Sequence, residues 1–140
     1  MARSEASIEI DRPPAEVFPW LLDPEKRLQW VSGLVSSEPV DETSYREVVQ
    51  EHGQRIQATA TVVRHEPPRA LEIRMSGRGF EARAGSRLTE ENGHTRLTSS
   101  LDVELGGLAR FAGGLVGRQT QRSLERSLAR LKLLLEGDST

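Results

Sequence analysis

Two residues near the middle of the chain, Tyr45 and Glu47, are the candidates for acid–base chemistry. They stand two positions apart in a predicted strand, so their side chains point to the same face of a sheet. A carboxyl group that faces an apolar pocket has a raised pKa and can act as a general acid or base. A catalytic role therefore requires that Glu47 points into the interior of the protein.

The orientation of Glu47 depends on the turn at His52-Gly53. A two-residue turn would direct Glu47 inward, and it would pair Tyr45 with Ala60, Glu47 with Ala58 and Val49 with Ile56. A three-residue loop with a glycine bulge is the alternative. That register would turn Arg46, Val48 and Gln50 inward and leave Glu47 in water, and the sequence leaves both registers open.

Other side chains with metal-binding or nucleophilic chemistry are dispersed along the chain. His52 and His94 lie at predicted hairpin turns and His65 at the end of a strand, whereas metal ligands must converge on one point. Cysteine is absent, which excludes disulfides and thiolate metal sites. No nucleophile motif or phosphate-binding glycine loop is present. We therefore expect neither a metal nor a cofactor.

Composition narrows the function classes further. The length of 140 residues suits a single domain. The chain has 19 Lys and Arg against 21 Asp and Glu, and only 4% aromatic residues. This balance argues against nucleic-acid binding, which needs a basic face or aromatic stacking platforms. No apolar run resembles a signal peptide or a membrane span, so we expect a soluble, cytoplasmic protein.

Periodicity and capping signals predict the first elements. Alternating apolar residues predict a strand at 7–11, and the apolar spacing of the next segment predicts a short helix at 14–22. Asp23 suits an N-cap and Pro24 the first helical position, so a second helix should follow and end near Trp30.

The middle of the chain has the pattern of an antiparallel sheet. Further strands are predicted at residues 34–40, 45–51, 54–64, 70–76, 80–90 and 94–105. Asn92-Gly93 is a strong hairpin signal. Its register pairs Ala82 with Val103, Ala84 with Leu101 and Leu88 with Leu97. Because every pair is apolar or small, we expect this face of the sheet to be buried.

The last predicted element is a long amphipathic helix that covers this apolar face. Its leucines repeat at helical spacing: Leu124, Leu128, Leu131 and Leu135. The stretch FAGGLVG at 111–117 places three glycines at the start of the helix, where each costs about 1 kcal/mol relative to alanine. We infer that the glycines and the small inner-face residues leave room for a ligand. Close packing of the helix backbone on the sheet is the alternative.

Two stretches resemble a known superfamily. SIEIDRPPAEVFPWLLDPEKRLQWV and ATATVVRHEPPRALEIRMSG are similar to the SRPBCC superfamily, specifically its polyketide cyclase/dehydrase-like branch. This branch is related to START lipid-transfer domains and the birch-pollen-allergen fold. The resemblance covers about residues 5–136 of a single domain. It implies an α+β helix-grip fold, in which a curved seven-stranded antiparallel sheet surrounds a long C-terminal helix, two short helices follow the first strand, and a hydrophobic cavity lies between sheet and helix.

Together, these observations predict that the protein binds, transports or senses a small hydrophobic molecule between the sheet and the last helix. The predicted ligand-binding residues are Trp30, Val49, Ala58, Ala60, Ile73, Met75, Phe80, Ala82, Ala84, Leu101, Phe111, Gly114 and Leu115. An enzyme of the cyclase/dehydrase type, with Glu47 or Tyr45 as its acid or base, is the alternative. A second alternative is an interaction domain with a filled core.

Two features have competing interpretations. Trp30 is either a wall or mouth residue of the cavity or a core residue beneath the second helix. The basic residues of the last helix form either an ordinary solvated face or a contact with a membrane surface. These basic residues are Arg110, Arg118, Arg122, Arg126, Arg130 and Lys132.

Overall fold

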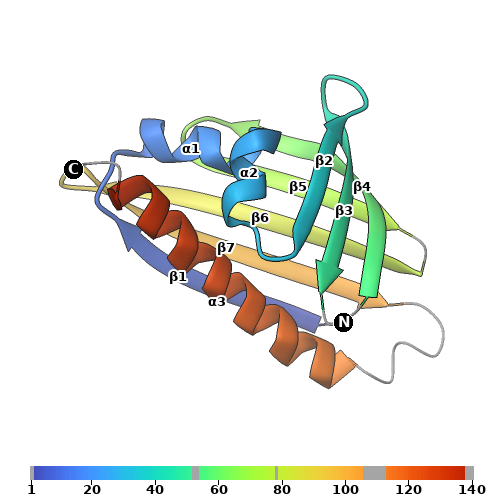
Figure 1. Ribbon diagram of the computed structural model, residues 1–140. Coiled ribbons are helices and arrows are strands. Elements are labelled where there is room, and N and C mark those ends of the chain that lie inside the picture. Colours follow the sequence, from blue (N-terminus) through green and yellow to red (C-terminus); the bar gives the residue numbers. More distant parts are fainter. Residues whose placement is uncertain (1, 52–53, 78, 106–112, 138–140) are drawn as a thin grey trace.

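The computed structural model describes residues 2–51, 54–77, 79–105 and 113–137, which form seven strands and three helices (Figure 1). In chain order these are β1 (Ala2–Ile10), α1 (Pro14–Leu22), α2 (Pro24–Trp30), β2 (Leu34–Pro39), β3 (Ser44–Glu51), β4 (Gln54–Glu66), β5 (Ala70–Gly77), β6 (Phe80–Glu91), β7 (His94–Leu105) and α3 (Gly113–Gly137). None of these helices is long and apolar enough to cross a membrane.

All seven strands belong to one antiparallel sheet with the order β1-β7-β6-β5-β4-β3-β2. The strands β1 and β2 therefore lie at opposite edges, although they are consecutive strands of the chain. The helices α1 and α2 carry the chain from one edge to the other, and α3 runs along β1 (Figure 1). The predicted α+β helix-grip architecture is confirmed.

Local signals placed several of these elements correctly. Asp23 Oδ1 accepts a hydrogen bond from the Glu25 backbone N–H at 3.0 Å, and Pro24 opens α2 as predicted. In the β6–β7 hairpin, Asn92 and Gly93 have φ values of 53° and 83°, as a turn with left-handed central residues requires. The three residue pairs predicted from this turn are all present.

Two strands extend beyond their predicted bounds by two residues or more. β1 begins at Ala2 rather than residue 7, because it pairs with β7 from Ala2 opposite Val103 to Ile10 opposite Thr95. The first residues of β1 are small or polar and show no apolar alternation, so only the pairing with β7 reveals them as a strand. β4 continues to Glu66 after a register shift between Val62 and Arg64.

The hydrophobic core lies where the second half of α3 meets α1, α2 and the sheet. Leu128, Leu131 and Leu135 are at most 6% exposed, which confirms the predicted leucine stripe. Trp20 is partly buried and packs against this core. The core includes Ile10, Val17, Phe18, Leu21, Trp30, Leu71, Ile73, Leu88 and Leu97.

Candidate functional site

The sheet register brings the predicted ligand-binding residues of the strands onto one inner face. Ala60 lies opposite Met75, Ile73 opposite Ala84, and Ala84 opposite Leu101. Ala58, Ala60, Ile73 and Ala82 are buried, whereas Val49, Met75, Ala84 and Leu101 are partly buried. Phe111 lies outside the described residues, as do the side chains of Phe80 and Leu115 and the surroundings of Gly114.

Packing along this inner face is uneven. Toward α1 and α2, Leu71, Leu88 and Leu97 are at most 5% exposed. Toward the opposite end of the same strands, Met75 and Leu101 are only partly buried, although they point to the same side of the sheet. The large apolar side chains of the inner face are therefore tightly enclosed at one end only.

Glu47 points inward, as the two-residue register requires. β3 pairs with β4 so that Tyr45 lies opposite Ala60, Glu47 opposite Ala58 and Val49 opposite Ile56. Glu47 is only 2% exposed. The alternative register, with Glu47 in water, is wrong.

The carboxylate of Glu47 has hydrogen-bond donors on both of its oxygens. Arg27 Nη2 donates to Glu47 Oε1 at 3.2 Å, and Ser37 Oγ donates to Glu47 Oε2 at 2.8 Å. Arg27 comes from α2, Ser37 from β2 and Glu47 from β3. A charge removed from water is tolerated when it is paired and hydrogen-bonded, which is the environment of this carboxylate.

Arg27 is a residue that the sequence interpretation missed. Its side chain is 11% exposed, and its Nε is buried without a hydrogen-bond partner among the described residues. The signal was present: Arg27 precedes Trp30 by three positions, which places both on the same side of a helix. These two are the buried residues of α2.

Trp30 has the predicted role of a core residue, and its role as a wall of the predicted cavity stays a prediction. It belongs to the core, where it is 8% exposed, and its indole N–H donates to the Trp20 carbonyl at 2.8 Å. It also lines a surface pocket of about 410 Å³ between the α2–β2 connection and α3. Arg126 and Arg130 of α3 contribute to the opposite wall of this pocket.

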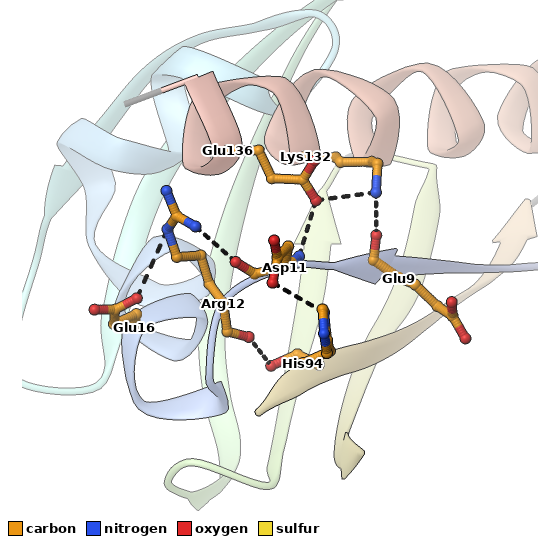
Figure 2. A network of polar contacts seen from close by, with 8 residues as sticks. Glu9, Asp11, Arg12, Glu16, His94, Lys132 and Glu136 are labelled. Carbon is orange, nitrogen blue, oxygen red and sulfur yellow. Dashed lines mark hydrogen bonds and ion pairs between the residues drawn. The ribbon is translucent and has the colours of Figure 1, made fainter. Parts of the chain in front are cut away.

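A second polar cluster fixes the C-terminal end of α3 to the end of β1 (Figure 2). Glu136 accepts hydrogen bonds from the Asp11 backbone N–H at 2.8 Å and from Lys132 Nζ at 2.9 Å. These two contacts lower the pKa of Glu136 below its ordinary value of 4.5. Lys132 Nζ also donates to the Glu9 carbonyl. Lys132 and Glu136 of α3 therefore hold this end of the helix against the end of β1 and against Asp11, which follows it.

The described histidines do not form a metal site. His94 pairs with Asp11 at 3.0 Å, and both side chains are more than half exposed. His65 is exposed, with its ring 5.7 Å from that of Phe18, and His52 lies outside the described residues. Across the described part of the chain, no group of three or more His, Cys, Asp or Glu residues is arranged to hold a metal ion.

A family model described as "Polyketide cyclase / dehydrase and lipid transport" matches residues 1–136. The chain belongs to this family. Family membership places it among proteins whose fold serves ligand binding or cyclase activity, and it does not distinguish between the two. No curated protein sequence matches the chain.

Solved structures agree with the fold of this family member. A conserved protein from Geobacillus kaustophilus is 21% identical with a TM-score of 0.84, over 96% of this chain and 95% of the other. A START superfamily protein from Mycobacterium smegmatis is 16% identical with a TM-score of 0.86, over 99% and 100%. The di-domain ARO/CYC BexL of the BE-7585A biosynthetic pathway is 15% identical with a TM-score of 0.76, over 94% of this chain and 45% of the other.

Proposed function

We propose that this family member binds a small hydrophobic molecule between the inner face of its sheet and α3, and that it acts as a carrier or sensor without covalent chemistry. The predicted ligand-binding residues form the proposed site. The family description names both cyclase or dehydrase activity and lipid transport, and the proposal follows the second of these.

The uneven packing of the inner face supports the position of this site. Ala58, Ala82 and Ala84 leave little side-chain volume on two of the strands. Interiors fill to crystal-like density unless something else occupies the space. Met75 and Leu101 are apolar and only partly buried beside these alanines, so an apolar ligand could cover them.

The observation that carries the choice of carrier over enzyme is the bonding of Glu47. Both oxygens of this carboxylate already accept hydrogen bonds from Arg27 and Ser37. A general acid or base must instead be within hydrogen-bond reach of a substrate proton. Glu47 and Tyr45 share the inward face of β3, and the present partners of the Glu47 carboxylate favour a structural role for it.

A binding experiment tests the proposal. The neutral dye N-phenyl-1-naphthylamine should bind the native protein at about one site, and neutral polycyclic compounds should displace it. A ligand that binds only the folded state raises the melting temperature by mass action. If no apolar compound at about 1 mM shifts the melting temperature, the proposal is contradicted.

The cyclase alternative makes a different forecast for the same protein. Glu47→Gln keeps the shape of the side chain and should leave binding of neutral ligands almost unchanged in a carrier. In an enzyme it would remove the acid or base and lower turnover by roughly 100-fold or more. Turnover of an apolar polycarbonyl substrate that Glu47→Gln abolishes would replace the carrier proposal with the enzyme.

A further inference from the structure

The ion pair between Arg27 and Glu47 leaves one strong donor unused. Nη2 of Arg27 is bonded to Glu47, whereas Nε is buried without a partner among the described residues. A buried guanidinium N–H that lacks an acceptor loses its hydration and gains nothing in return. Such a group marks a place where an acceptor atom would bind favourably.

Neighbouring side chains on the sheet do not supply this acceptor. Ala58 lies opposite Glu47 and Ala60 is the next inward residue of β4, and an alanine side chain has no polar atom. Both oxygens of Glu47 are already bonded to Arg27 Nη2 and Ser37 Oγ. An acceptor for Arg27 Nε therefore has to come from outside this group of residues.

We propose that Arg27 Nε anchors the ligand through a carbonyl-type oxygen, and that the ligand is a neutral apolar molecule with one such acceptor. This inference rests on the proposed ligand-binding function and adds the chemical class of the ligand. The carbonyl oxygen accepts the hydrogen bond from Nε, and the apolar remainder lies against the small residues of the inner face.

The neutrality of the ligand follows from Glu47. Its carboxylate already balances the charge of Arg27 at 3.2 Å, so the pair as a whole attracts no further anion. A ligand carboxylate at Nε would stand close to the carboxylate of Glu47, and like charges in a buried site repel strongly. A carbonyl oxygen accepts the same hydrogen bond without this repulsion.

Three naphthalene compounds of similar shape separate the possibilities. They are 2-ethylnaphthalene, which has no acceptor, 2-acetylnaphthalene, which has a carbonyl, and 2-naphthoate, which is an anion. Their affinities are measured by displacement of N-phenyl-1-naphthylamine. Water solvates the ketone better than the hydrocarbon, so the informative quantity is the ketone-to-hydrocarbon affinity ratio in each protein, compared between wild type and variant.

The first arm uses the charge-free variant Arg27→Met/Glu47→Met. Its matched control is Arg83→Met/Glu72→Met, which makes the same change in an ion pair that is 53% and 33% exposed. The ketone-to-hydrocarbon ratio should fall at least roughly tenfold in the first variant, because a hydrogen bond to a charged donor is lost. It should stay at the wild-type value in the control.

The second arm uses Glu47→Gln, with Glu72→Gln as its control. Without the carboxylate of Glu47, the charge of Arg27 is unbalanced and available to an anion. Binding of 2-naphthoate should therefore strengthen roughly tenfold in Glu47→Gln but not in Glu72→Gln. Arg27→Met/Glu47→Met is expected to be the more stable of the two variants, because it leaves no uncompensated buried charge.

The outcomes separate this inference from the proposed function. If the compounds bind but the ketone-to-hydrocarbon ratio is the same in wild type and in Arg27→Met/Glu47→Met, the role of Arg27 is overturned and the carrier function survives. A failure of 2-naphthoate to gain affinity in Glu47→Gln overturns it as well. If neither 2-ethylnaphthalene nor 2-acetylnaphthalene displaces the dye from the wild-type protein, the proposed function falls and this inference falls with it.

Discussion

Arg27 on α2 and Glu47 on β3 form a buried ion pair, with Nη2 and Oε1 3.2 Å apart. The two residues are 20 positions apart in the sequence. Removing one partner of such a pair leaves an uncompensated buried charge, whereas replacing both partners with apolar residues removes that penalty. The pair therefore predicts opposite effects for a single and a double substitution.

Arg27→Met should lower the free energy of unfolding by about 3–5 kcal/mol, and Arg27→Met/Glu47→Met should restore most of the loss. Urea denaturation of the two variants measures both values. Arg83→Met is the control, because its exposed pair with Glu72 should contribute less than about 1 kcal/mol. A double variant as unstable as Arg27→Met would show that the loss comes from packing rather than from charge.

The alanines of the inner face should respond differently to a larger side chain. Ala60 is 0% exposed within the core, so Ala60→Leu should overpack it and cost about 1–3 kcal/mol. Ala84 is only partly buried, so Ala84→Leu should cost little stability and should weaken dye binding by occupying the ligand's space. Thermal unfolding and dye titration of both variants test this, and equal destabilisation by the two would count against an open site near Ala84.

Gly114 tests the interpretation of the glycines at the start of α3. If they border a ligand site, Gly114→Ala should raise the free energy of unfolding by up to about 1 kcal/mol through helix propensity and should weaken ligand binding. If the helix backbone packs closely on the sheet, the added methyl group should instead cost about 1–3 kcal/mol. A less stable Gly114→Ala protein with unchanged dye affinity would refute the ligand-site interpretation.

Glu136 should make stability depend on pH in the acid range. Its folded-state pKa lies below the ordinary value of 4.5, so the ionised carboxylate stabilises the folded protein above that pH. This contribution is lost as the pH falls below 4.5 and through the folded-state pKa. Glu136→Gln should therefore be less stable than wild type at neutral pH, by about 1 kcal/mol or less for a partly exposed side chain.

Urea denaturation at pH 7 and pH 3 measures this difference, which should shrink at the lower pH. Glu90→Gln is the control, because Glu90 is exposed on β6. A difference between wild type and Glu136→Gln that is the same at both values of pH would contradict a charge-based role for Glu136.

The sequence by itself determined most of the elements and the face that the β6–β7 hairpin presents to the interior. Apolar periodicity and turn chemistry are local properties, so the Asn92-Gly93 turn was enough to specify the pairing of β6 with β7. The Asp23 cap and Pro24 specified the start of α2 in the same way. The sequence left two orientations open for the Glu47 side chain, inward or outward, because both a two-residue turn and a three-residue loop fit His52-Gly53.

Only the tertiary structure decided which residues meet. The partnership of Arg27 with Glu47 depends on α1 and α2 carrying the chain across the sheet to β2 and β3, and no local pattern encodes that path. The first residues of β1 are a strand because β7 offers its backbone groups to them, not because their side chains alternate. Local sequence fixes backbone preferences over a few residues, whereas contacts between distant elements depend on how their apolar faces pack together.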